Sequence, residues 1–168
     1  MKLEVISISN KANKWEEETL NFYLKQITPY ANLTIENIKP AQGKKLKIKE
    51  VQSFDEKKIL TKIKPNSLII SFDRKGKHFD SLQFAELTEK FLSSKKDCSL
   101  VIGGSHGLSD SFLKKSDHVI SFSALTFPHK LFKILLIEQL YRAISIIKNK
   151  PYHKSVSYTH LTLPTIYS

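Results

Sequence analysis

Apolar residues along the chain follow two alternating patterns, short apolar runs and longer segments in which apolar residues recur every three or four positions. The short runs predict β-strands, and the helical spacing predicts amphipathic helices. The predicted strands cover residues 3–8, 33–38, 67–72, 98–102 and 118–122. The predicted helices run from Trp15 to Ile27 before Pro29, from Ile48 to Ile63, from Asp80 or Ser81 to Phe91, from Leu108 to Lys115, and from Pro128 to Lys148. Alternating strands and helices predict an α/β fold with a mostly parallel sheet flanked by helices.

Two predicted strands are mostly apolar. Residues 67–72 form an apolar run of strand length, which is typical of a strand covered on both faces of a parallel sheet. Residues 98–102 are expected to form the next buried strand. Cys98 begins this strand, so we expect a buried strand residue and not a nucleophile. Since it is the chain's one cysteine, an internal disulfide and a cysteine metal cluster are excluded.

The closing helix, residues 128–148, is apolar around much of its circumference. A helix of this kind must be buried on more than one side. A monomer would bury it in its own core, whereas a homodimer interface would explain the excess of apolar residues. Both interpretations are open at this point.

The charge balance favours a polyanionic partner. The 168 residues include 27 Lys and Arg against 16 Asp and Glu, a formal net charge of +11. Such a charge binds nucleic acid if it gathers on one face, and the alternative is an ordinary lysine-rich, solvated surface. The loop 40–49 is dense in lysine and is open to the same two interpretations, an RNA-facing arm or a solvated connection.

The organisation of the chain is simple. No apolar run approaches the roughly 18 residues of a membrane span, and the first residues turn polar too soon for a signal peptide. We therefore expect a cytoplasmic protein with no membrane partner. One compact domain is predicted over residues 1–154. Residues 155–168 continue none of the preceding pattern and are interpreted as a non-native or disordered tail.

Two loops at predicted strand ends carry candidate chemistry. The strand 98–102 ends in Gly103 and Gly104, which permit close approach of a ligand or form a plain tight turn. The strand 118–122 ends in the loop Ser123-Ala124-Leu125-Thr126-Phe127. The Rossmann fingerprint is absent, because neither the glycine spacing nor the later acidic residue is present. The two strand ends are expected to share one pocket of another kind.

Four motifs in order resemble a known family: Asp73–Lys77, Ile102–Leu108, Ser121–His129, and Glu138–Ala143 with the closing Pro151–Lys154. They resemble the SPOUT-class RNA methyltransferases, specifically the small bacterial family that methylates N3 of a pseudouridine in 23S ribosomal RNA. The resemblance implies a C-terminal deep trefoil knot, which ordinary connection rules would not predict. It also implies a homodimer in which the tail of one subunit completes the other subunit's site, and a substrate presented by the assembled ribosome.

The resemblance further implies S-adenosylmethionine as the methyl donor. Carried over to this sequence, the donor contacts come from Phe72, Gly103, Gly104, Phe122, Ser123, Ala124, Leu125, Thr126 and Phe127. For Leu125 and Phe127 we also expect core packing, so both roles would hold together.

The candidate catalytic residues are Arg142, Tyr152 and His153. Arg142 forms an i,i+4 pair with Glu138 or contacts the substrate, and the resemblance favours the second role. Tyr152 is placed to stack on a base, and His153 is a proton acceptor or a substrate positioner.

Methyl transfer of this kind needs no metal, and His78, His106 and His118 lack the spacing of a metal site. His129 either bonds the backbone at the start of the closing helix or lines the pocket.

The sequence thus predicts a homodimeric, S-adenosylmethionine-dependent methyltransferase acting on 23S rRNA. One rival is a basic RNA- or ribosome-binding protein with a degenerate cofactor pocket, which would not saturate with S-adenosylmethionine. A second rival is a SPOUT methyltransferase acting on tRNA, which a change of RNA substrate would reveal.

Overall fold

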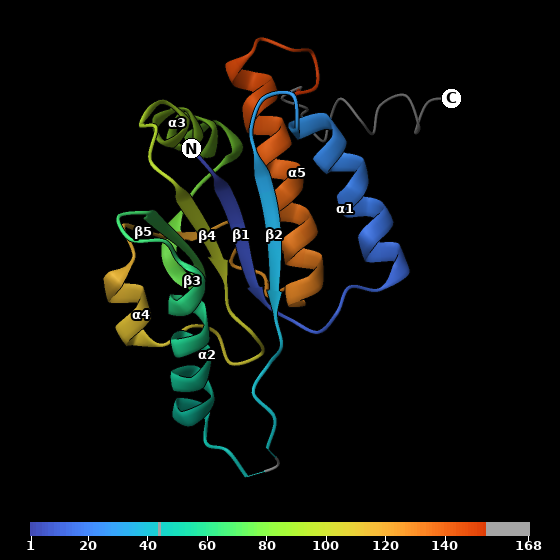
Figure 1. Cartoon of the computed structure of the whole chain (residues 1–168). Helices are drawn as coiled ribbons and strands as arrows, with labels where there is room; N and C mark the ends of the chain where they lie inside the picture. Colours follow the sequence, from blue (N-terminus) through green and yellow to red (C-terminus); the bar gives the residue numbers. More distant parts are fainter. Residues whose placement is uncertain (44, 154–168) are drawn as a thin grey trace, which may run out of the picture.

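The computed structural model describes residues 1–43 and 45–153, which form a five-stranded parallel sheet and five helices (Figure 1). The strand order is β2-β1-β4-β3-β5, and every neighbouring pair is parallel. The strands are β1 (Leu3–Ile8), β2 (Leu33–Ile38), β3 (Leu68–His78), β4 (Cys98–Ile102) and β5 (His118–Ser121). The helices are α1 (Lys14–Ile27), α2 (Ile48–Lys62), α3 (Ser81–Ser93), α4 (Asp110–Lys115) and α5 (His129–Ile147). The predicted α/β fold is confirmed.

The sheet is the middle of three layers (Figure 1). Helices α1, α3 and α5 cover one face, with α5 in contact with both of the others. Helices α2 and α4 cover the other face over a second, smaller core. Successive strand residues face the two cores in turn, so that Val5 packs in the larger core and Ile6 in the smaller one. This two-sided burial explains why the strand runs are mostly apolar.

Local expectations about the elements hold in detail. The side chain of Asp80 caps α3 by accepting a hydrogen bond from the Gln83 backbone N–H at 2.8 Å. Cys98 is buried in β4, where burial raises the pKa of its thiol to about 12. It is therefore a packing residue, as expected. No helix among residues 1–43 and 45–153 is long and apolar enough to cross a membrane. The proposed tail, 155–168, lies outside the described residues.

Helix α5 is buried within a single chain by the sheet, α1 and α3. Burial on more than one side is thus confirmed, and its apolar circumference does not by itself require a second subunit. One large apolar residue of α5, Leu131, stays 40% exposed. The homodimer and the trefoil knot both stay predictions.

Strand β3 runs six residues past the predicted end at Phe72. Its register against β5 breaks there, because Ile120 is opposite Phe72 and again opposite Lys77. The motif Asp73–Lys77 is therefore an irregular segment that passes directly over β5. A Cβ atom added to Gly76 would lie 2.6 Å from the carbonyl carbon of Ile120. The glycine is present because two backbones touch.

We expect Gly76→Ala to lower the free energy of unfolding by about 1–3 kcal/mol, because backbone atoms of β5 must move to admit the methyl group. Urea unfolding followed by circular dichroism measures this loss. Gly43→Ala is the matched control, since its Cβ would meet only the mobile end of the Leu46 side chain at 3.0 Å. Equal unfolding midpoints for the two variants would show that the β3–β5 contact is not tight.

Candidate active site

The predicted cofactor loops come together at the carboxyl ends of β3, β4 and β5. Four phenylalanines form the base of this region: Phe72 at the end of the regular part of β3, Phe84 on α3, Phe122 after β5 and Phe132 on α5. Ring centroids of Phe72 and Phe122 are 5.2 Å apart, and those of Phe84 and Phe122 are 5.0 Å apart. Phe132 closes the cluster at 5.6 Å from Phe72. The cluster fixes where the loop after β5 begins.

The glycine turn after β4 is tightly packed against itself. The backbone N–H of Gly107 donates to the carbonyl of Gly104 at 3.0 Å, and Gly107 has a φ of 73°. A Cβ on Gly103 would lie 2.7 Å from the carbonyl carbon of Gly107. The need for glycine at position 103 is therefore explained by the turn itself. The turn lies beside the end of β3, because Asp73 Oδ2 is 3.5 Å from the position of a Cβ on Gly107.

The loop after β5 is ordered by its own hydroxyl groups. Ser121 Oγ donates to the carbonyl of Ser123, and Ser123 Oγ accepts from the Leu125 backbone N–H, both at 2.9 Å. Arg74 Nη1 donates to Thr126 Oγ1 at 3.3 Å and so joins the loop to the Asp73–Lys77 segment. Phe72, the glycine turn and the loop 122–127 are thus brought to one edge of the sheet, as predicted.

One expectation for this loop is wrong. Leu125 does not pack in the core, because its side chain is 69% exposed. Its backbone N–H is bonded to the Ser123 hydroxyl within the exposed part of the loop. Phe127 is partly buried. An exposed leucine beside serine and threonine hydroxyls is a surface that suits an apolar ring with polar edges.

The three candidate catalytic residues meet on the second half of α5, around Glu138 and Arg142. Arg142 donates to Glu138 Oε1 from Nη2 at 2.6 Å and from Nε at 3.0 Å. Tyr152 donates to the same oxygen at 3.1 Å, and its ring lies 5.1 Å from the Arg142 guanidinium carbon. Arg142 Nη1 lies 3.1 Å from Nδ1 of His153. The i,i+4 pair is present, and it is the centre of a larger network.

The contacts in this network determine which of its atoms donate hydrogen bonds and which accept them. A guanidinium only donates, so Nδ1 of His153 accepts and a neutral imidazole carries its hydrogen on Nε2. In this arrangement His153 offers a donor to a substrate, which favours positioning over proton acceptance. Burial and the neighbouring Glu138 carboxylate raise the pKa of Tyr152, so its phenol stays protonated and can donate. Glu138, which sequence reasoning treated only as a pairing partner, holds Arg142 and Tyr152 directly, and Arg142 in turn holds His153.

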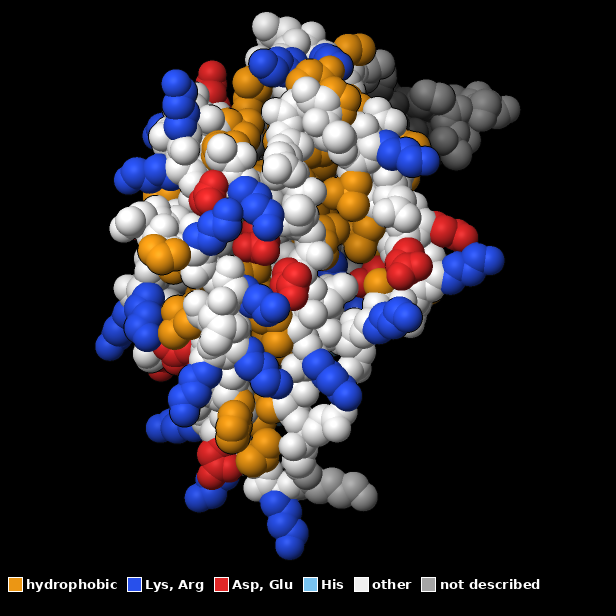
Figure 2. All heavy atoms as spheres, in the orientation of Figure 1, with side chains coloured by type: hydrophobic (Ala, Val, Ile, Leu, Met, Phe, Trp, Pro, Cys, Tyr) orange, Lys and Arg blue, Asp and Glu red, His pale blue; other side chains and the backbone are white. Residues whose placement is uncertain are grey.

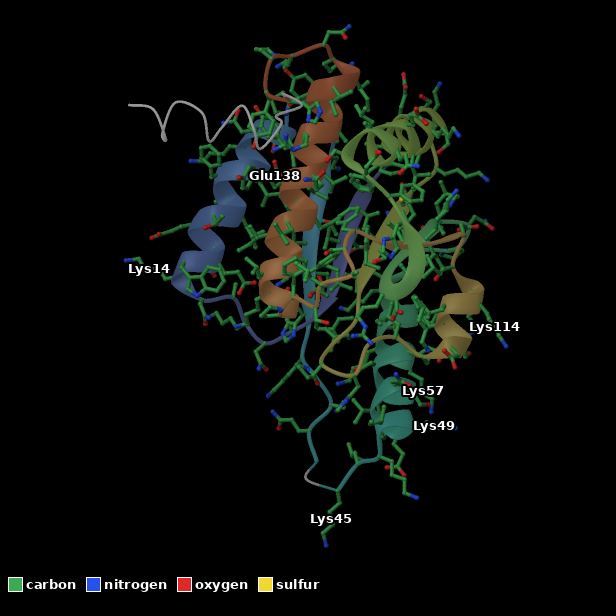
Figure 3. All side chains as sticks on the ribbon, turned by 180° about the vertical axis from the view of Figure 1, so that it is seen from behind. Lys14, Lys45, Lys49, Lys57, Lys114 and Glu138 are labelled. Carbon is green, nitrogen blue, oxygen red and sulfur yellow. The ribbon has the colours of Figure 1, made fainter. Side chains whose placement is uncertain are left out.

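The two halves of the predicted site are far apart in one chain. Helix α5 starts at the carboxyl edge of the sheet and runs to the opposite edge (Figure 1). His129 and Arg142 are separated by about 20 Å along its axis at roughly 1.5 Å per residue. Figure 3 shows Glu138 near the middle of α5, and Arg142 follows one turn further from the cofactor loops. A single chain therefore does not bring Arg142, Tyr152 and His153 to the cofactor loops.

Lysines gather over the face that carries α2 and α4 (Figure 2). Helix α2 contributes Lys49, Lys57, Lys58 and Lys62, and α4 contributes Lys114 and Lys115. Figure 3 shows Lys45, Lys49, Lys57 and Lys114 projecting outward on this side of the molecule. Such a face is suited to a polyanion. The loop before α2 stays open to both interpretations, since outward-pointing lysines suit either one.

Sequence reasoning missed a carboxyl group near the glycine turn. Asp55 on α2 is 4% exposed and lies close to Gly104. It stands four residues from both Val51 and Ile59, on the apolar side of the helix. An acidic residue within an apolar stripe is the signal that would have revealed it. His129 lines the same cavity as Asp55, which is one of its two predicted roles. No group of three or more His, Cys, Asp or Glu that suits a metal is found in the described part of the chain.

Several known proteins are similar in sequence to this chain over most of its length. A family model described as "Predicted SPOUT methyltransferase" matches residues 1–153. The chain belongs to the SPOUT methyltransferase family. It is 37% identical to the "Ribosomal RNA large subunit methyltransferase H" of Carboxydothermus hydrogenoformans, over 92% of this chain and all of that protein. Identities to proteins of the same name from Clostridium botulinum and Clostridium acetobutylicum are 38% and 36%, with the same coverage.

A solved structure, of a probable methylase family protein from Haemophilus influenzae Rd KW20, has a TM-score of 0.48 and 16% identity over 96% of this chain and 74% of that one. It is too distant to inform the site. Family membership makes the chain a methyltransferase and implies a methyl donor. The predicted family is confirmed, and the individual residue roles stay predictions.

Proposed function

We propose that this protein transfers a methyl group from S-adenosylmethionine to N3 of a pseudouridine in 23S rRNA within the assembled ribosome. The observation that supports it most is the meeting of Phe72, the glycine turn and the loop 122–127 at one edge of the sheet. In a SPOUT family member these are the segments expected to hold the donor. The names of the relatives support an rRNA substrate, and the lysine-rich face supports a nucleic-acid partner.

The residues at this edge fit the proposed donor. The exposed Leu125 side chain and the partly buried Phe127 offer apolar surface for the adenine ring. Loop hydroxyls and backbone groups are available for the ribose and the amino-acid part. When bound, the donor supplies an electrophilic methyl group, and the chain's own residues must align N3 of the base with it. Arg142 and Tyr152 donate in the network, and His153 accepts from Arg142 through Nδ1. We assign the three side chains to holding the target nucleotide.

A homodimer resolves the separation within one chain. Because Arg142 lies about 20 Å along α5 from the cofactor loops, the site is complete only if a second copy brings its own Arg142, Tyr152 and His153 to them. Two-fold pairing would form two such sites at once. The partly exposed Leu131 and the exposed Leu82, 55% accessible, are apolar residues of α5 and α3 that a partner would cover.

The function is tested with S-adenosylmethionine labelled in its methyl group. Ribosomes of the 70S form, free rRNA and tRNA, all from a strain that lacks the modification, serve as separate substrates. We expect label on a 23S pseudouridine, with transfer to ribosomes exceeding transfer to free rRNA, and mass spectrometry locates it. Label on tRNA alone would replace the proposal with the tRNA enzyme. If no RNA is labelled and S-adenosylmethionine does not bind saturably, the chain is a basic RNA-binding protein without catalytic activity.

The same assay covers the tail. A chain ending at Lys154 is compared with the full chain of 168 residues, because the tail directly follows Tyr152 and His153. If both chains bind the donor and neither transfers the methyl group, the assigned substrate is wrong. The tail is then not the cause of the inactivity.

A further inference from the structure

A cavity of about 160 Å³ lies at the carboxyl edge of the sheet beside the predicted donor loops. It is enclosed by the end of β1, the segment after β2, helix α2, the glycine turn and the start of α5. Its lining combines apolar Ile8, Leu46 and Val51 with polar Asp55, His106 and His129. The glycine turn is shared, since Gly104, Ser105 and His106 line the cavity while Gly103 belongs to the donor edge. A small planar ring placed here would lie next to the donor site.

Asp55 lines this cavity, and its carboxyl group is not fully hydrogen-bonded. The residue is 4% exposed, and its Oδ1 atom has no hydrogen-bond partner among the described residues. A buried acceptor without a partner costs free energy. Burial raises the pKa of the carboxyl group, while the Ala41 backbone N–H and the charges of Lys58 and His106 lower it. Burial lowers the pKa of His129, as do the charges of Lys133 and Lys130, so that imidazole provides no cation at neutral pH. The cavity therefore calls for a ligand that donates an N–H.

We propose that this cavity receives the target pseudouridine base and that the Asp55 carboxylate, which lines it, accepts the base's N1–H, which makes Asp55 the residue that selects pseudouridine over uridine. The inference rests on the proposed function. Enzymes that act on a base hold it in a pocket and read its edge by hydrogen bonds. Pseudouridine is joined to ribose through C5, so its N1 carries a hydrogen. In uridine N1 is the glycosidic atom and has none.

The base chemistry leaves the reacting atom free. N1 and N3 lie on either side of the C2 carbonyl of the ring, so a base held through N1–H by Asp55 leaves N3 unoccupied and available to the donor. Uridine in the same pose would leave the carboxylate buried and without a donor. Sites built on such a polar contact discriminate strongly against a ligand that lacks the matching group.

The test compares Asp55→Asn with the unchanged protein on two ribosome substrates, one with pseudouridine and one with uridine at the target position. The substitution replaces one carboxylate oxygen with an NH₂ group, which cannot accept from N1–H, and it removes the negative charge. We expect the pseudouridine-to-uridine ratio of kcat/KM to fall by about 10- to 100-fold through the loss on pseudouridine, as for a lost hydrogen bond to a charged group. Asp55→Ala should lower the ratio in the same direction if the asparagine variant is unstable.

Donor affinity and folding are measured in parallel by calorimetry and circular dichroism. Asp110→Asn is the matched control, because Asp110 is exposed and pairs only with Lys75 on the surface; its ratio should not change. An unchanged ratio in both Asp55 variants would overturn the proposal. So would a loss of donor affinity equal to the loss of activity, which would place the donor itself against Asp55. If the unchanged protein methylates neither substrate, the proposed function fails first.

Discussion

Arg142→Ala is expected to reduce kcat for methyl transfer by about 100- to 1,000-fold, the usual effect of removing one donor directed at a reacting centre. Arg142 holds His153 and shares Glu138 with Tyr152, so its loss releases His153 and removes the cation beside the Tyr152 ring. Donor affinity should be retained, because the donor loops lie at the opposite end of α5. Single-turnover transfer to ribosomes and a donor titration provide the two readouts.

Arg142→Lys is the matched variant for this experiment. It keeps the positive charge but loses the planar fork that contacts Glu138 and His153 together. We expect it to recover only a small part of the activity. Full activity in the lysine variant would show that charge alone matters, and unchanged activity in the alanine variant would remove Arg142 from the site.

Mixed dimers test whether the site is shared. Leu125→Glu places a carboxylate on the donor loop, and since Leu125 is 69% exposed the change should not disturb packing. We expect this variant and Arg142→Ala each to be inactive alone. Unfolded together and refolded as a mixture, they should regain about a quarter of the sites, because half of the dimers are mixed and each mixed dimer has one intact site. No recovery would favour a site built within one chain.

Lys133→Ala is expected to lower the free energy of unfolding by about 3–5 kcal/mol, the cost of leaving a buried charge without its partner. Lys133 is fully buried and donates to Glu16 at 2.7 Å, to Asn37 at 2.8 Å and to Ser9 at 3.1 Å. Glu16 is also fully buried. The cluster joins α5 to α1 and to the ends of β1 and β2, so the loss should appear as one cooperative unfolding transition at lower urea.

The control is a lysine in an exposed pair. Lys14 lies 4.0 Å from Glu18 on α1, and both side chains are largely solvated, so Lys14→Ala should change stability by less than about 0.5 kcal/mol. Adding Glu16→Gln to Lys133→Ala should restore part of the stability, because it removes the uncompensated charge. If the two single lysine variants unfold alike, the buried pair contributes nothing.

Most of the elements followed from local patterns. Mostly apolar runs predicted β4 and the first part of β3, helical spacing predicted α2 and α5, and Asp80 predicted the start of α3. These features depend on neighbours a few residues apart, which the sequence displays directly. The extension of β3 to His78 was not predicted, because it depends on the backbone contact between Gly76 and Ile120.

The chemistry divides in the same way. Motif order was enough to name the family and the residues of its two loops, because those residues keep their spacing along the chain. Packing alone decided that Leu125 is exposed, that Lys133 is buried with Glu16, and that Asp55 faces a cavity. It also decided that Arg142, Tyr152 and His153 gather around Glu138 at the end of α5 away from the donor loops. Each of these features depends on contacts between segments far apart in the chain. The local pattern of apolar and polar residues does not indicate which distant segments will pack together.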